Sequence, residues 1–91
     1  MQANSIHETN LVNRFLGDIL LQKKDPKALD YLKKVYFDYN TNTEYLNTLC
    51  YACIYFKDYQ YGKKILTELK QLSPNNPNIP AYEKKLSMQS N

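Results

Sequence analysis

The sequence predicts an all-α protein built from antiparallel helical hairpins, and three observations support this prediction. Apolar residues recur at helical spacing almost throughout the 91 residues. Only two glycines and four prolines interrupt that pattern. Capping signals divide the chain into about five helices joined by short loops, so neighbouring helices must run antiparallel. The expected helices span residues 5–22, 26–39, 41–56, 59–72 and 77–86.

The first two helices are predicted from their N-terminal residues. Ser5 and Glu8 have the S-x-x-E spacing of a capping box, in which each side chain accepts a hydrogen bond from a free backbone N–H. Asp25 followed by Pro26 combines a good N-cap with the helical position where proline costs little. These two helices form the first hairpin.

The remaining helices follow from similar signals. Thr41 with Glu44 repeats the capping-box spacing and opens the third helix, and Asp58 is the expected N-cap of the fourth. The segment 73–76 then stops the fourth helix. The last helix leads into a polar tail over 87–91 and carries three apolar residues on one face: Ile79, Tyr82 and Leu86.

The two hairpins are similar in sequence. Sliding the chain against itself by about 34 residues aligns apolar or small residues in both helices of each hairpin. The aligned pairs are Val12 with Leu46, Phe15 with Leu49, Leu16 with Cys50, Ile19 with Cys53, Ala28 with Gly62, Leu32 with Leu66, and Val35 with Leu69.

This period and pattern resemble the tetratricopeptide repeat (TPR). The second unit fits best, with Leu46, Leu49, Cys50, Cys53, Gly62, Leu66 and Pro74 at the family's marked places. The first unit departs from the pattern at Asn40, where proline is expected, and Leu16 and Cys50 replace a small glycine. The resemblance covers about residues 9 to 76. It implies a single domain over 1–91, with TPR-like units over 9–42 and 43–76 and a capping helix and tail over 77–91. The alternative is an unrelated five-helix bundle.

In that family the first helix of each unit lines a concave groove that holds a partner segment. Carried over place by place, the groove would present Asn10, Asn13, Gly17, Leu20 and Leu21, then Glu44, Asn47, Tyr51, Ile54 and Tyr55. The residues expected to contact the partner are Asn13, Leu20, Leu21, Asn47, Tyr51, Ile54 and Tyr55. Such an apolar surface fits an amphipathic helix. Alternatively, the last helix folds over the groove, or a second copy covers it.

We therefore expect a non-enzymatic adaptor or chaperone whose partner is a small helical client protein or a co-chaperone. In size and outline the chain also resembles, more remotely, the short repeat proteins that chaperone needle subunits of bacterial type III secretion systems. That resemblance implies that an amphipathic helix of a client is sequestered until export. A homo-oligomeric structural subunit is a further alternative.

Candidate catalytic and metal-binding residues are few. Cys50 and Cys53 form a C-x-x-C pair inside a predicted helix, and His7 is the only other soft metal ligand and lies far away in sequence. We expect the two cysteines to be small core residues and His7 to be exposed. The chain contains no Gly-rich phosphate loop and no hydrolase motif. The sequence thus predicts no enzyme, cofactor or metal site.

Charge and localisation signals are weak. The net charge of +3 is far from that of a dedicated nucleic-acid binder. Four lysine doublets and nine tyrosines nevertheless leave an RNA-associated protein as an alternative. The N-terminal residues lack a signal-peptide pattern, no apolar run is long enough for a membrane span, and free thiols suit a reducing compartment. We expect a cytoplasmic protein without membrane insertion.

Overall fold

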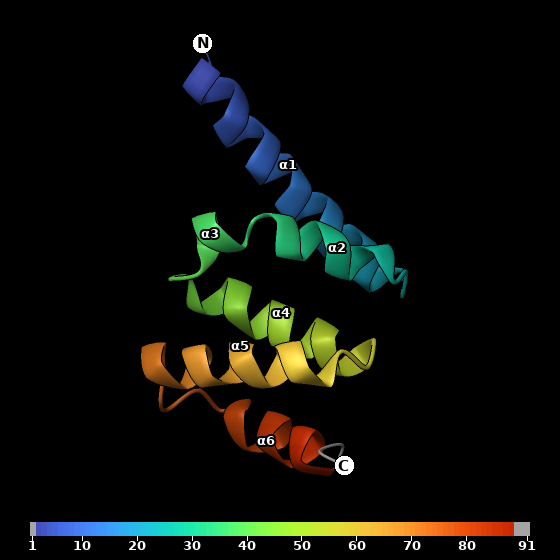
Figure 1. Cartoon of the computed structure of the whole chain (residues 1–91), viewed down its shortest axis with the longest axis vertical. Helices are drawn as coiled ribbons and strands as arrows, with labels where there is room; N and C mark the ends of the chain where they lie inside the picture. The colour runs from blue at the N-terminus through green and yellow to red at the C-terminus, as the bar shows by residue number, and fades with distance from the viewer. Residues whose placement is uncertain (1, 89–91) are drawn as a thin grey trace. The chain divides into compact units, whose positions relative to one another are not determined.

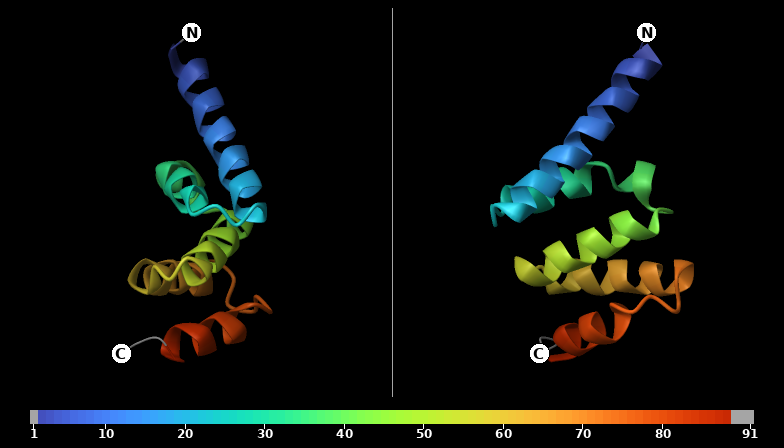
Figure 2. Two further views of the ribbon diagram at one scale, coloured as in Figure 1. Left: turned by 90° about the vertical axis from the view of Figure 1, so that its right-hand side faces the viewer. Right: turned by 180° about the vertical axis from the view of Figure 1, so that it is seen from behind.

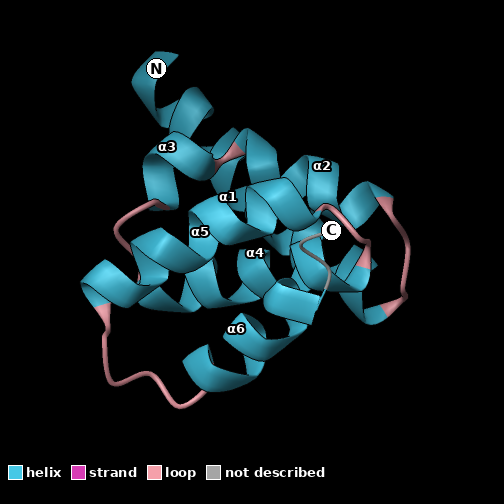
Figure 3. Ribbon diagram, turned by 60° about the horizontal axis from the view of Figure 1, so that its bottom comes forward, coloured by secondary structure: helices cyan, strands magenta, loops and turns pink. Residues whose placement is uncertain are grey.

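The computed structural model describes the backbone of residues 2–88 and the side chains of residues 9–88. All regular structure within this part is helical (Figure 3). The described helices are α1 (Gln2–Gln22), α2 (Lys27–Lys34), α3 (Tyr36–Tyr39), α4 (Thr43–Tyr55), α5 (Tyr59–Leu72) and α6 (Ile79–Met88). The all-α prediction is confirmed. None of these helices is long and apolar enough to cross a membrane.

The chain forms two compact units, Met1–Tyr39 and Asn40–Asn91. In the first unit α1 packs against α2, and in the second α4 packs against α5 (Figures 1 and 2). These are the two helix pairs that the sequence predicts. The helix α6 packs on both α4 and α5 and therefore belongs to the second unit.

Helices α1 and α4 end in the same way. Lys24 and Lys57 both have left-handed backbone, with φ of 62° and 68°. The N–H of Asp25 donates to the carbonyl of Leu20 (2.9 Å), and that of Lys24 donates to Leu21 (3.0 Å), which is the Schellman pattern. The same two bonds recur after α4, from Asp58 to Cys53 at 2.8 Å and from Lys57 to Ile54 at 3.2 Å. The equivalent turn residues Lys24 and Lys57 are therefore separated by one residue fewer than the expected 34-residue period.

This shorter spacing changes the face of α1 that meets α2. Gly17, and not Leu16, is the residue beneath α2, because a Cβ on Gly17 would lie 2.7 Å from the Cγ of Leu32. The single 34-residue register predicted for both helices is therefore wrong for α1. When α1 is realigned by one residue, Gly17 and not Leu16 is the counterpart of Cys50. A glycine then occupies the position where the repeat pattern has a small residue.

The predicted core residues of α1 are not buried. Their side chains are between 36% and 56% exposed: Val12, Phe15, Leu16 and Ile19. Their predicted counterparts on α4 are fully buried: Leu46, Leu49, Cys50 and Cys53. The prediction of core positions is thus correct for α4 and wrong for α1.

The second predicted helix, 26–39, is interrupted. Val35 ends α2 with φ of −104° and ψ of 15°, and its N–H donates to the carbonyl of Leu32 at 3.4 Å. The short helix α3 then follows. Val35 is β-branched and three aromatic residues follow within α3, and all four have lower helix propensity than the residues before them. Residues 2–88 therefore contain one more helix than the five predicted for the chain.

Two of the predicted capping boxes are also wrong. Helix α1 begins at Gln2, so Ser5 lies within the helix and is not its N-cap. The side chains of Ser5, His7 and Glu8 lie outside the described residues. The N-cap of α4 is Asn42, and not Thr41, because the Asn42 side chain accepts a hydrogen bond from the Tyr45 N–H at 2.9 Å.

Other helix ends agree with the sequence prediction. The Asp25 carboxylate accepts a hydrogen bond from the Lys27 N–H at 2.9 Å, as predicted for a capping residue, although Pro26 occupies the N-cap position of α2. Asp58 occupies the N-cap position of α5, which spans the predicted range. The last helix continues to Met88, two residues into the predicted tail, whose other residues lie outside the described part.

The cap of α4 gives a testable difference between two neighbouring residues. We expect Asn42→Ala to lower the free energy of unfolding by about 1 kcal/mol, because the Tyr45 N–H loses its acceptor. The matched control Thr41→Ala should change it by less than about 0.5 kcal/mol. Urea denaturation followed by circular dichroism measures both. A larger effect of Thr41→Ala would restore the capping box predicted from the sequence.

Candidate functional site

Helix α6 is held against the α4–α5 pair by its apolar face. Ile79, Tyr82 and Leu86 are buried, as the sequence predicts. Leu86 approaches the Gly62 of α5, where a Cβ would lie 3.3 Å from its Cδ2 atom. Glycine at this place therefore lets α6 lie close to α5. The position of α6 in turn defines a groove beside α4.

The groove consists of two adjoining cavities of the second unit, which we call together the α4–α6 groove. The first has a volume of about 500 Å³ and is lined on the α4 side by Tyr51, Ile54 and Tyr55. Its other wall comes from α6 and the residue before it: Asn78, Ala81, Tyr82 and Lys85. The second, of about 540 Å³, shares Ile54, Ala81 and Lys85 and adds Tyr59, Lys84 and Met88. The structure thus brings three of the predicted groove residues together.

Aromatic side chains dominate the α4 wall. The rings of Tyr51 and Tyr55 stack with centroids 6.2 Å apart and an interplanar angle of 24°. The ring of Phe56 packs edge-on against Tyr55, with centroids 4.9 Å apart. Tyr51 and Tyr55 remain 40% and 43% exposed. A stacked and half-exposed pair offers a preformed apolar surface at little cost in side-chain entropy.

Polar side chains next to the groove connect α4 to the start of α6. The side-chain carbonyl oxygen of Asn47 accepts a hydrogen bond from the Asn78 side-chain amide at 3.0 Å, and the Asn47 side chain also bonds the Tyr82 phenol. Burial raises the pKa of Tyr82 to about 12, an effect that Cys50 strengthens and the bond to Asn47 opposes. The phenol therefore stays protonated at neutral pH. Asn47, predicted to contact a partner, here links α4 to the start of α6.

The predicted groove residues of α1 have different surroundings. Asn13, Leu20 and Leu21 are half-buried within the first unit. The Asn10 side-chain amide donates a hydrogen bond to the Asp38 carboxylate of α3. Gly17 lies buried against α2, so its prediction as a groove residue is wrong.

The α6 wall of the groove was not predicted from the sequence, from which we expected the last helix either to cap the repeats or to fold over the groove. Ala81, Lys84, Lys85 and Met88 nevertheless recur at the three- and four-residue spacing of one helical face. That spacing was the signal from which the α6 wall could have been predicted. The face of α6 next to its buried face must line any open space beside α4. The last helix therefore forms a wall of the groove.

The cysteine pair is part of the core. Cys50 and Cys53 are both fully buried and neither forms a disulfide, and the Cys50 thiol donates to the carbonyl of Gly62 at 3.8 Å. Burial raises the pKa of Cys50 to about 12, so this thiol is neutral at physiological pH. The prediction that the two cysteines are small core residues is confirmed. Among the described side chains, no three His, Cys, Asp or Glu residues gather as a metal site would require.

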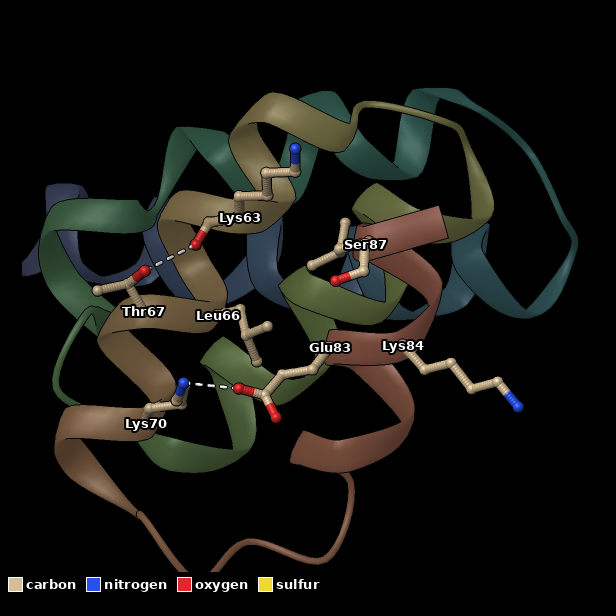
Figure 4. A pocket seen from close by; sticks show the side chains of 8 residues that line it. Lys63, Leu66, Thr67, Lys70, Glu83, Lys84 and Ser87 are labelled. Atoms are coloured by element: carbon tan, nitrogen blue, oxygen red, sulfur yellow. Dashed lines mark hydrogen bonds and ion pairs between the residues drawn. The ribbon is translucent and has the colours of Figure 1, made fainter. Parts of the chain in front are cut away.

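A third depression, of about 570 Å³, lies on the opposite side of α6, between α5 and α6 (Figure 4). An ion pair between Lys70 and Glu83 crosses it at 2.6 Å. Lys63 and Lys84 also line it. Because six of its eight lining residues are charged or polar, this depression fits an apolar ligand less well than the α4–α6 groove.

Some lysine doublets are engaged with tyrosines of their own helices. The Lys34 ammonium lies 4.6 Å from the centroid of the Tyr31 ring, and that of Lys64 lies 5.4 Å from the centroid of Tyr61. The Lys64 ammonium also lies 3.4 Å from the Glu68 carboxylate. Each contact covers one face of its tyrosine ring, so that face is not open to stacking with a nucleic-acid base.

Comparisons of this chain with protein families, with curated proteins and with solved structures find no match. The α4–α6 groove is therefore interpreted from its own residues.

Proposed function

We propose that this protein is a non-enzymatic adaptor or chaperone that holds an amphipathic helix of a partner protein in the α4–α6 groove. The observation that carries the proposal is the grouping of Tyr51, Ile54 and Tyr55 around one cavity with a wall of α6. The lining combines apolar side chains with polar and charged groups from α6 and the residue before it, which is the chemistry of helix-binding grooves.

The proposal includes a TPR-like architecture. Its support is the repeated hairpin: α1 and α4 end in the same Schellman turn, and each is followed by a helix of the same hairpin. Glycines stand at close helix contacts in both units, Gly17 against Leu32 and Gly62 against Cys53. In such an array the first helix of each hairpin lines the binding groove, as α4 does here.

A groove of this size suits a chaperone that sequesters a single helix of a small client. A subunit that assembles through an amphipathic helix would be kept monomeric while that helix lies in the groove. We extend the proposal to a client of the needle-subunit type in bacterial type III secretion, for which the small size of the chain and its apolar groove are the support.

Site-specific cross-linking in the native cell tests the proposal. A photoreactive phenylalanine derivative is placed at Tyr55, inside the groove, or at Phe37 of α3, which is 87% exposed and lies outside the groove. We expect one small helical protein to be cross-linked from Tyr55 and not from Phe37, because Tyr55 lines the groove and Phe37 does not.

Three outcomes would contradict the proposal. Equal labelling from both positions would indicate non-specific contact. Cross-links to RNA would favour the RNA-associated alternative, and cross-links only between copies of this chain would favour a homo-oligomeric subunit. Ile54→Asp serves as a second check, since it should abolish the cross-link at Tyr55 while helical circular dichroism is retained.

A further inference from the structure

The charged residues of α6 point to the chemistry of the partner, given the proposed function. Three successive residues of α6 carry charge, and Glu83 points to the α5 side, where it pairs with Lys70 at 2.6 Å (Figure 4). Within the described part of the chain, Lys84 and Lys85 form no ion pair. The one carboxylate of this segment is thus neutralised away from the groove.

Both unpaired ammonium groups come from residues that line the α4–α6 groove. Lys85 lines both of its cavities, whereas Lys84 lines one of them beside Met88 and also lines the depression between α5 and α6. None of the residues that line these two cavities is Asp or Glu. The groove therefore combines apolar side chains of Tyr51, Ile54 and Tyr55, which we call its floor, with the positive charges of Lys84 and Lys85, which we call its rim. No carboxylate among the lining residues neutralises the rim.

Such a rim discriminates between helices that would fit the floor equally well. A partner that covers the floor excludes water from the neighbouring ammonium groups, which is costly unless the partner supplies the opposite charge. A basic helix adds repulsion at the same place, whereas carboxylates attract at long range and fix the register. On an α-helix, a carboxylate three or four residues from an apolar contact lies on the adjoining face.

We propose that the partner segment is an acidic amphipathic helix, whose apolar stripe packs on Tyr51, Ile54 and Tyr55 and whose flanking carboxylates pair with Lys84 and Lys85. The aliphatic residues Ile54, Ala81 and Met88 favour a protein helix over a phosphate-rich ligand, which gains little from an aliphatic surface. This inference rests on the proposed function of the groove.

Two designed peptides test it. Both are fluorescent helices with the same leucine stripe, and they differ only in flanking residues, which are all Glu in one and all Lys in the other. We expect the chain to bind the Glu peptide about tenfold more tightly in low salt, as measured by fluorescence anisotropy. The double variant Lys84→Glu/Lys85→Glu should reverse this preference. The control Lys63→Glu/Lys64→Glu, with the same charge change on exposed positions of α5, should keep it.

The possible results separate the two proposals. If both peptides bind equally well and Ile54→Asp abolishes both, the groove holds helices but the acidic preference is wrong. If the Lys84→Glu/Lys85→Glu variant keeps the preference of the unmodified chain, the inference is likewise overturned. If neither peptide binds, the proposed function fails. A labelled single-stranded RNA that binds more tightly than the Glu peptide, and loses binding in the same variant, would assign the two lysines to nucleic acid.

Discussion

Leu49→Ala is expected to lower the free energy of unfolding by about 2–5 kcal/mol, and Leu16→Ala by about 1 kcal/mol. The two leucines hold corresponding places in α4 and α1 once the shorter spacing of the turns is taken into account. Leu49 is fully buried, so its truncation leaves a cavity in addition to the lost burial. Leu16 is 36% exposed, and water can fill the space that its truncation opens. Urea denaturation of the two variants and the unmodified chain, followed by circular dichroism, measures the difference.

Equal losses from the two substitutions would contradict this expectation. They would mean that the exposed face of α1, with Val12, Phe15 and Ile19, is covered in solution. Measuring the molecular mass at the same protein concentration distinguishes the explanations, because a covering second copy doubles the mass. A monomer with equal losses would indicate that α1 buries Leu16 more completely than the structure shows.

Several helix ends could be predicted from the sequence, because local residues determine them. Asp58 directly precedes α5, the Asp25 carboxylate bonds the first residue of α2, and the polar segment 73–76 ends α5. The N-cap of α4 was harder to assign. Thr41 and Asn42 are adjacent residues that both favour caps, and only the hydrogen bond from Tyr45 decides between them.

The register of the first hairpin could not be read from apolar spacing. Val12, Leu16 and Ile19 form a good helical stripe, and the sequence analysis assumed that such a stripe is buried. In the structure the buried contact with α2 is made by Gly17, a residue that no hydrophobic pattern identifies. The turn residue Lys24, equivalent to Lys57, is the better marker of register, because the backbone geometry repeats there.

The predictable part of the groove is its α4 wall, since Tyr51, Ile54 and Tyr55 lie on one face of a single helix. The α6 wall depends on how that helix is rotated about its axis. The burial of Tyr82 and the ion pair of Glu83 with Lys70 show this rotation. Both are contacts between residues distant in sequence, so the position of Lys85 beside Ile54 could not be derived from local spacing alone.

Gly17→Ala should destabilise the protein by about 1–3 kcal/mol, although glycine to alanine within a helix normally stabilises by up to about 1 kcal/mol. The expected loss of stability, in place of the usual gain, has a steric cause. The new Cβ would lie 2.7 Å from the Cγ and 2.8 Å from the Cδ2 of Leu32, and 3.3 Å from its backbone nitrogen. Because Leu32 is fully buried, its side chain has little room to move away.

Removing the obstructing side chain provides the matched control. Leu32→Ala alone should cost about 2–5 kcal/mol, since it leaves a cavity under α1. In that background Gly17→Ala should be neutral or stabilising by up to about 1 kcal/mol, because its methyl group then enters empty space and the helix propensity of alanine takes effect. The four proteins form a double-mutant cycle, from which urea denaturation should give a coupling energy of about 1–3 kcal/mol. Additive effects would mean that Gly17 and Leu32 are not in contact. The one-residue shift of α1, which makes Gly17 the small residue of the first hairpin, would then be wrong.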